Sequence, residues 1–194
     1  PRLREYLRQE TKLTPSVLQE LDSSTDRTLE RLESPLREGR WDRRGLVVGH
    51  VQSGKTTHYT SVIAKALDSG YQIVIVLAGI HKSLRSQTHE RIDKDLIGLD
   101  SAALLEAARR GESLPAGAAV IGVGRFDLQR GRSDLPFTIL TCTTAADDGD
   151  FRTPIARQIG FKVSPGTRLV MVVKKNRTIL TNLRDWLRAQ NAAP

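Results

Sequence analysis

The chain has 194 residues, a length that suits one α/β domain with its own core and is short for two independent domains. It has 30 Lys and Arg against 22 Asp and Glu, which gives a net charge of +8. This charge favours polyanionic partners, but a protein whose surface is basic without such a partner would have the same net charge. One cysteine excludes a disulfide framework and a cysteine-based zinc site, and no apolar run reaches the roughly 20 residues of a membrane span. We therefore expect a cytoplasmic protein without a membrane partner.

The N-terminal part of the chain predicts a helical extension made of short surface helices. Thr14 has the position of a helix cap and is followed by a proline, which suits the first turn of a helix. A second cap is expected at Ser24 or Thr25, and the helix that follows should stop at Pro35. Few apolar residues occur per turn, so these helices should lie on the surface of the main domain.

From residue 45 the pattern changes to strands that alternate with helices. The apolar run 45–51 predicts a strand, residues 55–68 predict a helix closed by Gly70, and residues 71–79 predict a second strand. A helical segment is expected near 81–95, and a short capped helix is expected from Ser101 to Gly111.

The second half of the chain continues this alternation. Further strands are expected at 118–126, 137–144 and 168–175. The segment 176–190 predicts a helix with one apolar face, formed by Ile179, Leu180, Leu183, Trp186 and Leu187. Apolar strands separated by helices predict an α/β fold with a mostly parallel sheet that is covered on both faces. We place the helical extension at 1–40 and the main domain at 41–194.

Residues 49–56, GHVQSGKT, match the phosphate-loop pattern G-x-x-x-x-G-K-[ST] between an expected strand and an expected helix. Gly49 and Gly54 allow a tight turn whose amide groups point at phosphate oxygens. Lys55 is expected to reach the β and γ phosphates, and the Thr56 hydroxyl is expected to bind Mg²⁺. The alternative is a glycine-rich turn with an exposed lysine. The predicted residues for binding ATP are Gly49, His50, Val51, Gln52, Ser53, Gly54, Lys55, Thr56 and Thr57.

A polar, basic segment follows the second expected strand. It should lie at the carboxyl edge of the sheet, where ligands bind in open α/β folds, and could hold the backbone of DNA. The alternative is a solvated helix with a charged face. The candidate nucleic-acid residues are Lys82, Arg85, Gln87, Thr88 and Arg91.

The stretch 45–93, which begins GLVVGHVQSGKTT and ends SQTHERID, closely resembles the start of the Z-one domain family. That family comprises proteins described as endonucleases of bacterial restriction and defence gene clusters, and it is related to superfamily-two helicases. The segments FTILTCTTAADDGDF and VMVVKKNRTILTNLRDWL match more weakly, in the order that the family has. The resemblance implies a RecA-like ATPase core, a three-layer sandwich coupled to DNA, with Gly49, Gly54, Lys55 and Thr56 in the nucleotide loop. It identifies no nuclease centre in this chain.

One departure from the pattern of such ATPases limits the ATPase activity that we expect. ATPases of this type need an acidic residue at the end of an apolar strand, to hold Mg²⁺ and orient the attacking water. Here the run 168–173 leads into Lys174 and Lys175, and the run 137–144 reaches Asp147 only after two alanines. We therefore expect an N-terminal fragment of a larger motor. It should carry no complete catalytic centre, be inactive as an ATPase by itself, and work with the remaining domains of the same polypeptide.

Other residues leave alternatives open. Asp147, Asp148 and Asp150 could bind a metal ion or could form a solvated acidic loop, and Trp41 could stack on adenine or pack under the N-terminal helices. The leading functional hypothesis is the ATP-binding motor domain of a DNA-processing protein of the restriction or defence type. The alternatives are a nucleotide-dependent switch and a P-loop kinase that acts on a small molecule.

Overall fold

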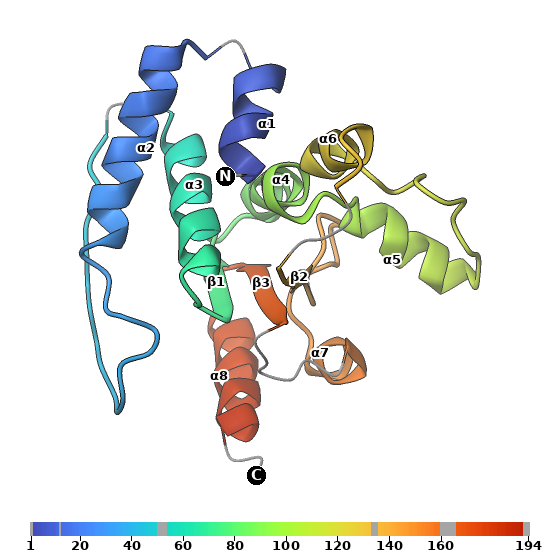
Figure 1. The fold of residues 1–194 in the computed structure, drawn as a ribbon. Coiled ribbons are helices and arrows are strands. Elements are labelled where there is room, and N and C mark those ends of the chain that lie inside the picture. Colours follow the sequence, from blue (N-terminus) through green and yellow to red (C-terminus); the bar gives the residue numbers. More distant parts are fainter. Residues whose placement is uncertain (1, 12, 50–53, 133–135, 160–165, 192–194) are drawn as a thin grey trace. The chain divides into compact units, whose positions relative to one another are not determined.

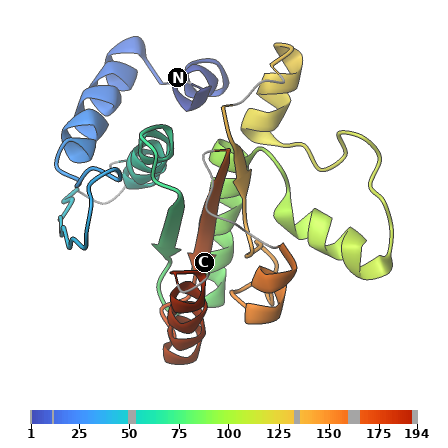
Figure 2. The same ribbon diagram turned by 60° about the horizontal axis from the view of Figure 1, so that its bottom comes forward.

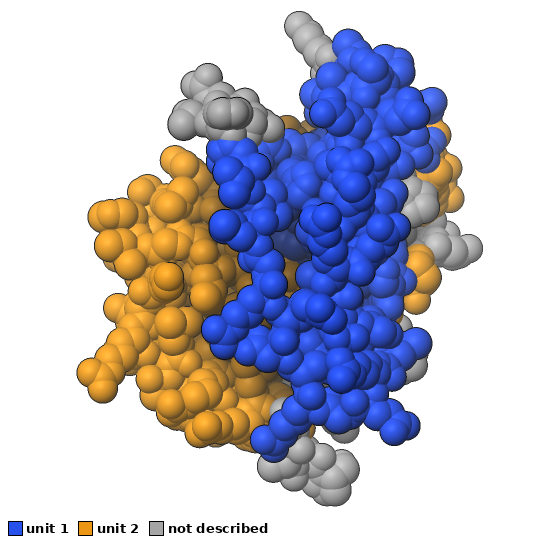
Figure 3. Space-filling view, turned by 90° about the vertical axis from the view of Figure 1, so that its left-hand side faces the viewer, with its two compact units in different colours: residues 1–71 blue, residues 72–194 orange. Residues whose placement is uncertain are grey.

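The computed structural model describes all residues except 1, 12, 50–53, 133–135, 160–165 and 192–194. The chain forms two compact units, residues 1–71 and residues 72–194, which Figure 3 colours separately. The expected boundary at residue 40 stays a prediction.

The first unit is built from three helices: α1 (Arg2–Glu10), α2 (Pro15–Leu29) and α3 (Lys55–Asp68). The three helices contact one another, and they bury Leu7, Leu18 and Leu67. Lys65 of α3 forms ion pairs with Asp22 and Asp26 of α2, at 2.8 and 2.5 Å. These helices are therefore held together by apolar packing and by ion pairs between α2 and α3.

Of the two predicted helix starts, only the one capped by Thr14 is present. The Thr14 side chain accepts the N–H of Val17 at 3.4 Å, as expected. The second cap, expected at Ser24 or Thr25, is wrong, because α2 runs through both residues and ends before Pro35. Both hydroxyls instead donate to the carbonyl of Leu21, one turn back, which lets them remain inside the helix.

The strand expected at 45–51 does not form in the described residues 45–49. Leu46 and Val48 are 87% and 85% exposed, and no described strand pairs with this segment. A strand needs a neighbour for its backbone hydrogen bonds, so apolar composition alone does not produce one. Helix α3 agrees with its prediction, and Gly70, with a φ of +105°, follows its end as expected.

The second unit is an α/β unit with a small parallel sheet (Figure 1). Its elements are β1 (Ile73–Leu77), α4 (Lys82–Ile92), a π-helix η1 (Asp93–Ile97), α5 (Ser101–Arg110), α6 (Gly122–Gln129), β2 (Thr138–Leu140), α7 (Thr153–Ile159), β3 (Thr167–Val173) and α8 (Arg177–Asn191). The strand order is β1-β3-β2, and both pairs are parallel. The expected α/β class and parallel sheet are thus present.

Strand β3 is the centre of this unit. Ile73 to Leu77 of β1 pair with Leu169 to Val173, whereas β2 pairs only with the first three residues of β3. Side chains alternate between the faces of a strand, so Leu169, Met171 and Val173 share one face. There they form a core with Trp186 and other residues of α8, whose predicted apolar face is confirmed. Helix α4 contacts β3 as well, and Figure 2 shows it behind the strand.

The strand expected at 118–126 is wrong, because residues 122–129 form helix α6. Two glycines let this helix pack closely against its neighbours. A Cβ on Gly122 would lie 2.1 Å from the carbonyl oxygen of Lys94, and one on Gly124 would lie 2.2 Å from that of Gly98. These positions allow α6 to approach the backbone of η1 and the glycine that ends it, which requires residues without side chains.

This close approach can be tested by adding one carbon atom. We expect Gly124→Ala to lower the free energy of unfolding by about 1–3 kcal/mol, because its Cβ would overlap backbone that cannot move aside. Urea denaturation measures the change. The control is Gly166→Ala, whose Cβ meets nothing within 4 Å. Equal stability of the two variants would contradict the tight packing of α6 on η1.

Candidate functional site

The expected phosphate loop leads into the first turn of α3. Gly54 caps this helix in the left-handed region, with a φ of +73°, where a residue with a side chain would be strained. The cap position of α3 is a glycine, and among the described residues no side chain caps this helix, whereas Thr14 and Asp100 cap α2 and α5. The first N–H groups of a helix have no intrahelical acceptor, so this uncapped end suits an anion.

The lysine of the motif lies against the start of the same loop. The Lys55 ammonium group donates to the carbonyl oxygen of Gly49 at 3.1 Å, which brings the two ends of the loop together. Gly54, Lys55 and Thr56 are exposed, and Thr57 is half-buried. The remaining predicted members, His50, Val51, Gln52 and Ser53, lie outside the described residues, so the nucleotide-binding role of the loop stays a prediction.

The predicted basic segment forms helix α4, and its residues differ in accessibility. Lys82 and Gln87 are exposed. The Thr88 hydroxyl donates to the carbonyl of Leu84 at 2.7 Å, and Arg91 pairs with Asp95 at 2.5 Å. Burial raises the pKa of Asp95, and Arg91 opposes that shift.

Arg85 was expected to contact nucleic acid, and for this residue the expectation is wrong because its side chain is fully buried. Its guanidinium donates to the carbonyl of Thr144 at 2.5 Å, and also to those of Ala146 and Gly149. Burial lowers the pKa of Arg85, and nearby Asp150 opposes that shift. Arg85 therefore holds the loop after β2 together from inside.

The acidic loop is not a metal site in this structure. Asp150 is 8% exposed, and its carboxylate lies 3.8 Å from the Arg85 Nε and 3.7 Å from the Lys174 ammonium group. A carboxylate between two cations is poorly suited to bind a third. Asp147 and Asp148 are exposed, and a hydrogen bond from Arg109 lowers the pKa of Asp148. A solvated loop therefore describes Asp147 and Asp148 but not Asp150. The part of the chain that is described contains no cluster of three metal-binding side chains.

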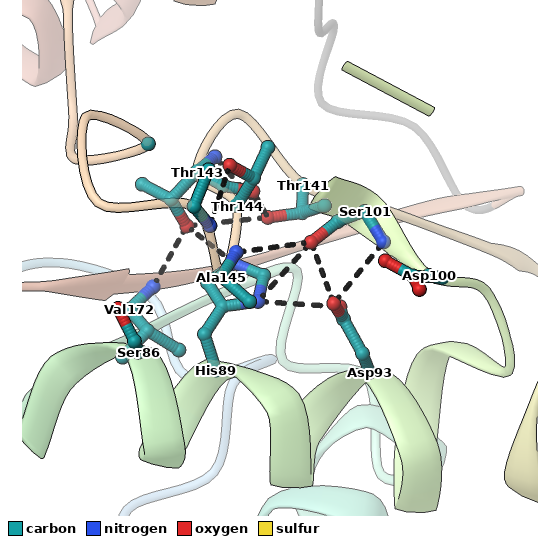
Figure 4. Close-up of polar contacts among 12 residues, drawn as sticks. Ser86, His89, Asp93, Asp100, Ser101, Thr141, Thr143, Thr144, Ala145 and Val172 are labelled. Carbon is teal, nitrogen blue, oxygen red and sulfur yellow. Dashed lines mark hydrogen bonds and ion pairs between the residues drawn. The ribbon is translucent and has the colours of Figure 1, made fainter. Parts of the chain in front are cut away.

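A buried polar chain next to Arg85 was not predicted (Figure 4). His89 of α4 contacts Thr143 through Nε2 at 3.0 Å and Asp93 through Nδ1 at 3.2 Å. The Thr143 hydroxyl also accepts the backbone N–H of Val172 in β3 at 3.0 Å. Ser101, at the start of α5, donates to the second oxygen of Asp93. These contacts connect four segments of the chain, at residues 89–93, 101, 143 and 172.

The order Asp93, His89, Thr143 resembles a hydrolytic triad, but it has no access to substrate. His89 is 0% exposed and Thr143 is 1% exposed. The Thr143 hydroxyl already accepts a backbone N–H, and a nucleophile needs room for the group that it attacks. We therefore assign this cluster a structural role: it supplies the hydrogen bond that β3 lacks where β2 ends.

This assignment predicts a specific loss of stability. Thr143→Val keeps the shape of the side chain but leaves the Val172 N–H and the His89 Nε2 without their partner, so we expect a loss of about 2–3 kcal/mol in the free energy of unfolding. Thr143→Ser keeps the hydroxyl and should lose about 1 kcal/mol or less. Chemical denaturation compares the two variants. A valine variant as stable as the serine variant would mean that the hydroxyl contributes nothing.

Trp41 lies edge-on against Tyr71, with ring centroids 6.3 Å apart, and it is 40% exposed. The Tyr71 hydroxyl donates to the carbonyl of Glu33. Trp41 therefore has a packing partner in the first unit and also an open part of its ring. Stacking on adenine stays a prediction.

At the carboxyl edge of the sheet, the segments after β1 and β3 run side by side. The N–H of Ala78 donates to the carbonyl of Val173 at 3.0 Å, and the N–H of Lys175 donates to that of Gly79 at 2.6 Å. This edge is basic, since Lys82, Lys175 and Arg177 are all exposed there. Within the described residues none of these three cations has an acidic partner.

Comparison with protein-family models gives no match, and neither curated proteins nor solved structures give a significant one. The resemblance to the Z-one domain family is therefore not independently supported. Among the helices described, none is both long enough and apolar enough to cross a membrane.

Proposed function

We propose that residues 49–56 bind the phosphates of ATP, and that the chain is the RecA-like motor domain of a DNA-processing enzyme. One observation carries the first part. The complete motif leads into α3 with Gly54 in the left-handed conformation, an uncapped helix start and Lys55 folded onto Gly49. The N-terminus of a helix, led by a left-handed glycine and followed by an exposed ammonium group, fits a polyphosphate.

The chain would supply three kinds of group to the nucleotide. Backbone amides of the loop and of the first turn of α3 would hold phosphate oxygens. Lys55 would exchange the Gly49 carbonyl for phosphate, and the exposed Thr56 hydroxyl would bind Mg²⁺. Mg²⁺ would neutralise charge on the phosphates when it is bound.

The proposal that the protein processes DNA rests on its net charge and on the position of its exposed cations. The net charge of +8 favours a polyanion, and the cations at the carboxyl edge follow parallel strands, where ligands bind in α/β folds. DNA is the polyanion that the sequence resemblance to the Z-one domain family would imply. DNA-stimulated nucleotide turnover by a longer form of the protein would separate a motor from the other two hypotheses.

A nucleotide-dependent switch is the second candidate, and one observation favours it. Each of the three described strands leads into neutral or basic residues, so none of them carries an acidic group at its carboxyl end. Binding requires only the loop and Mg²⁺, whereas turnover requires groups that act on the attacking water. A kinase remains a third hypothesis, to be tested with small-molecule acceptors.

The nucleotide proposal predicts a selective loss of affinity. Lys55→Ala should weaken binding of Mg²⁺ADP by about tenfold or more, because it removes a direct charge contact to phosphate. Folding should be unaffected, since Lys55 is exposed. Isothermal titration calorimetry measures affinity, and thermal unfolding checks the fold.

The matched control is Lys94→Ala, which removes an exposed lysine from η1. It should bind Mg²⁺ADP like the unsubstituted chain. Equal affinities of Lys55→Ala and the unsubstituted chain would remove Lys55 from the site. No binding by the unsubstituted chain would reject the nucleotide proposal.

We further expect this chain to release phosphate from ATP no faster than the buffer background. The described strands carry no acidic group at their carboxyl ends, and Asp150 is engaged by Arg85 and Lys174. A phosphate-release assay with and without DNA tests this. Robust turnover that Asp147→Asn or Asp150→Asn abolishes would place a catalytic carboxylate in the acidic loop.

A further inference from the structure

Helices α7 and α8 of the second unit (Figure 1) form a small cleft between them. Its volume is about 180 Å³, and all seven residues that line it belong to these two helices. Liquid water of that volume would contain about six molecules, so the cleft has room for a small organic molecule.

One side of the cleft is apolar. Trp186 lines it and is 4% exposed, and its ring packs edge-on against Phe151 with centroids 5.8 Å apart. Ala189, three residues further along α8, contributes only a methyl group to the lining. A short apolar or aromatic body of a ligand would pack against these two side chains, because apolar contact removes both surfaces from water.

The polar side chains of the cleft have unused hydrogen-bonding groups. Within the described part of the chain, four of them form no hydrogen bond and no ion pair: Thr153 and Arg157 of α7, and Asn182 and Gln190 of α8. The indole N–H of Trp186 is buried and also has no acceptor there, although a buried indole N–H usually has one. The lining therefore offers more donors than acceptors to a ligand.

The charges of the cleft favour one kind of anion. Arg157 supplies a guanidinium group, which binds a carboxylate through two parallel hydrogen bonds. Asp185 lines the cleft too, and Arg184 pairs with it at 2.8 Å. A ligand with one negative charge is attracted by Arg157, whereas a second negative charge would be repelled by Asp185.

We propose that the cleft between α7 and α8 binds a small monocarboxylate, with the carboxylate on Arg157 and an apolar body on Trp186 and Ala189. Asn182 and Gln190 would donate further hydrogen bonds from α8. The inference goes beyond the proposed function, since the seven lining residues belong neither to the phosphate loop nor to the basic carboxyl edge of the sheet.

The experiment compares four probes. Benzoate carries the carboxylate, benzamide is its neutral counterpart, phenylphosphate carries a second negative charge, and acetate lacks the apolar body. Proton–nitrogen correlation NMR follows the indole N–H signal of Trp186, and the other tryptophan, Trp41 of the first unit, is the internal reference. We expect benzoate to shift the Trp186 signal and to bind about fivefold more tightly than benzamide or acetate, because only benzoate has both the charge and the apolar body.

Variants assign this preference to the cleft. Arg157→Gln should remove the preference for benzoate over benzamide, and Ala189→Leu should abolish binding of both because the larger side chain fills the cleft. The matched control is Arg188→Gln, which changes an arginine of α8 that does not line the cleft, and it should preserve the preference. All three positions are exposed, so the variants should fold, and thermal unfolding checks this.

The results that overturn the inference are distinct from those that overturn the proposed function. Equal affinities of benzoate and benzamide, or a preference that Arg157→Gln retains, reject recognition of a carboxylate at this cleft. Tighter binding of phenylphosphate than of benzoate rejects the selection for a single charge. Benzoate binding that leaves the Trp186 signal unchanged and that Lys55→Ala removes places the anion at the phosphate loop instead. Absence of binding of all four probes, in a chain that still binds Mg²⁺ADP, rejects the cleft as a site and leaves the nucleotide proposal intact.

Discussion

The second unit depends on how the carboxyl half of β3 is held. Strand β2 pairs with β3 only from Thr138 to Leu140, and beyond this point the backbone of β3 would lack a neighbour on that side. The N–H of Val172 is buried, and an unpaired buried N–H is costly. The Thr143 hydroxyl supplies the missing acceptor, and His89 and Asp93 hold that hydroxyl in place. The Thr143 side chain thus accepts the hydrogen bond from β3 that a longer β2 would have accepted through its backbone.

The need to satisfy buried backbone groups gives the two faces of α4 different roles. Arg85 and His89 are one turn apart and both point inward, Arg85 to the carbonyls after β2 and His89 to Thr143. Lys82 and Gln87 of the same helix face solvent. A helix rich in polar residues is therefore not wholly a solvated surface, since its inner face satisfies buried backbone groups. Burying Arg85 is tolerable because carbonyl groups surround it and Asp150 is nearby.

The sequence was sufficient where a local pattern decides the structure. The periodicity of apolar residues located β1, β3, α3 and α8. Cap residues located the start of α2 at Thr14 and the end of α5 at Gly111. It failed where the partner is distant. The apolar run at 45–49 has no described neighbour, and residues 122–129 form a helix whose glycines lie against the backbone of η1 and of Gly98. For the candidate site, the motif located Gly54 and Lys55, but burial of Arg85 depends on a loop some sixty positions further along the chain.

The unpaired segment before the phosphate loop has a consequence for handling the protein. Leu46 and Val48 are almost fully exposed in an apolar stretch without a described strand partner. Such a stretch offers backbone donors and acceptors to any other edge strand, and neighbouring molecules compete for them as concentration rises. The net charge of +8 opposes this through repulsion between molecules, which salt screens. Colloidal stability of the purified chain should therefore be lowest in concentrated, high-salt solution.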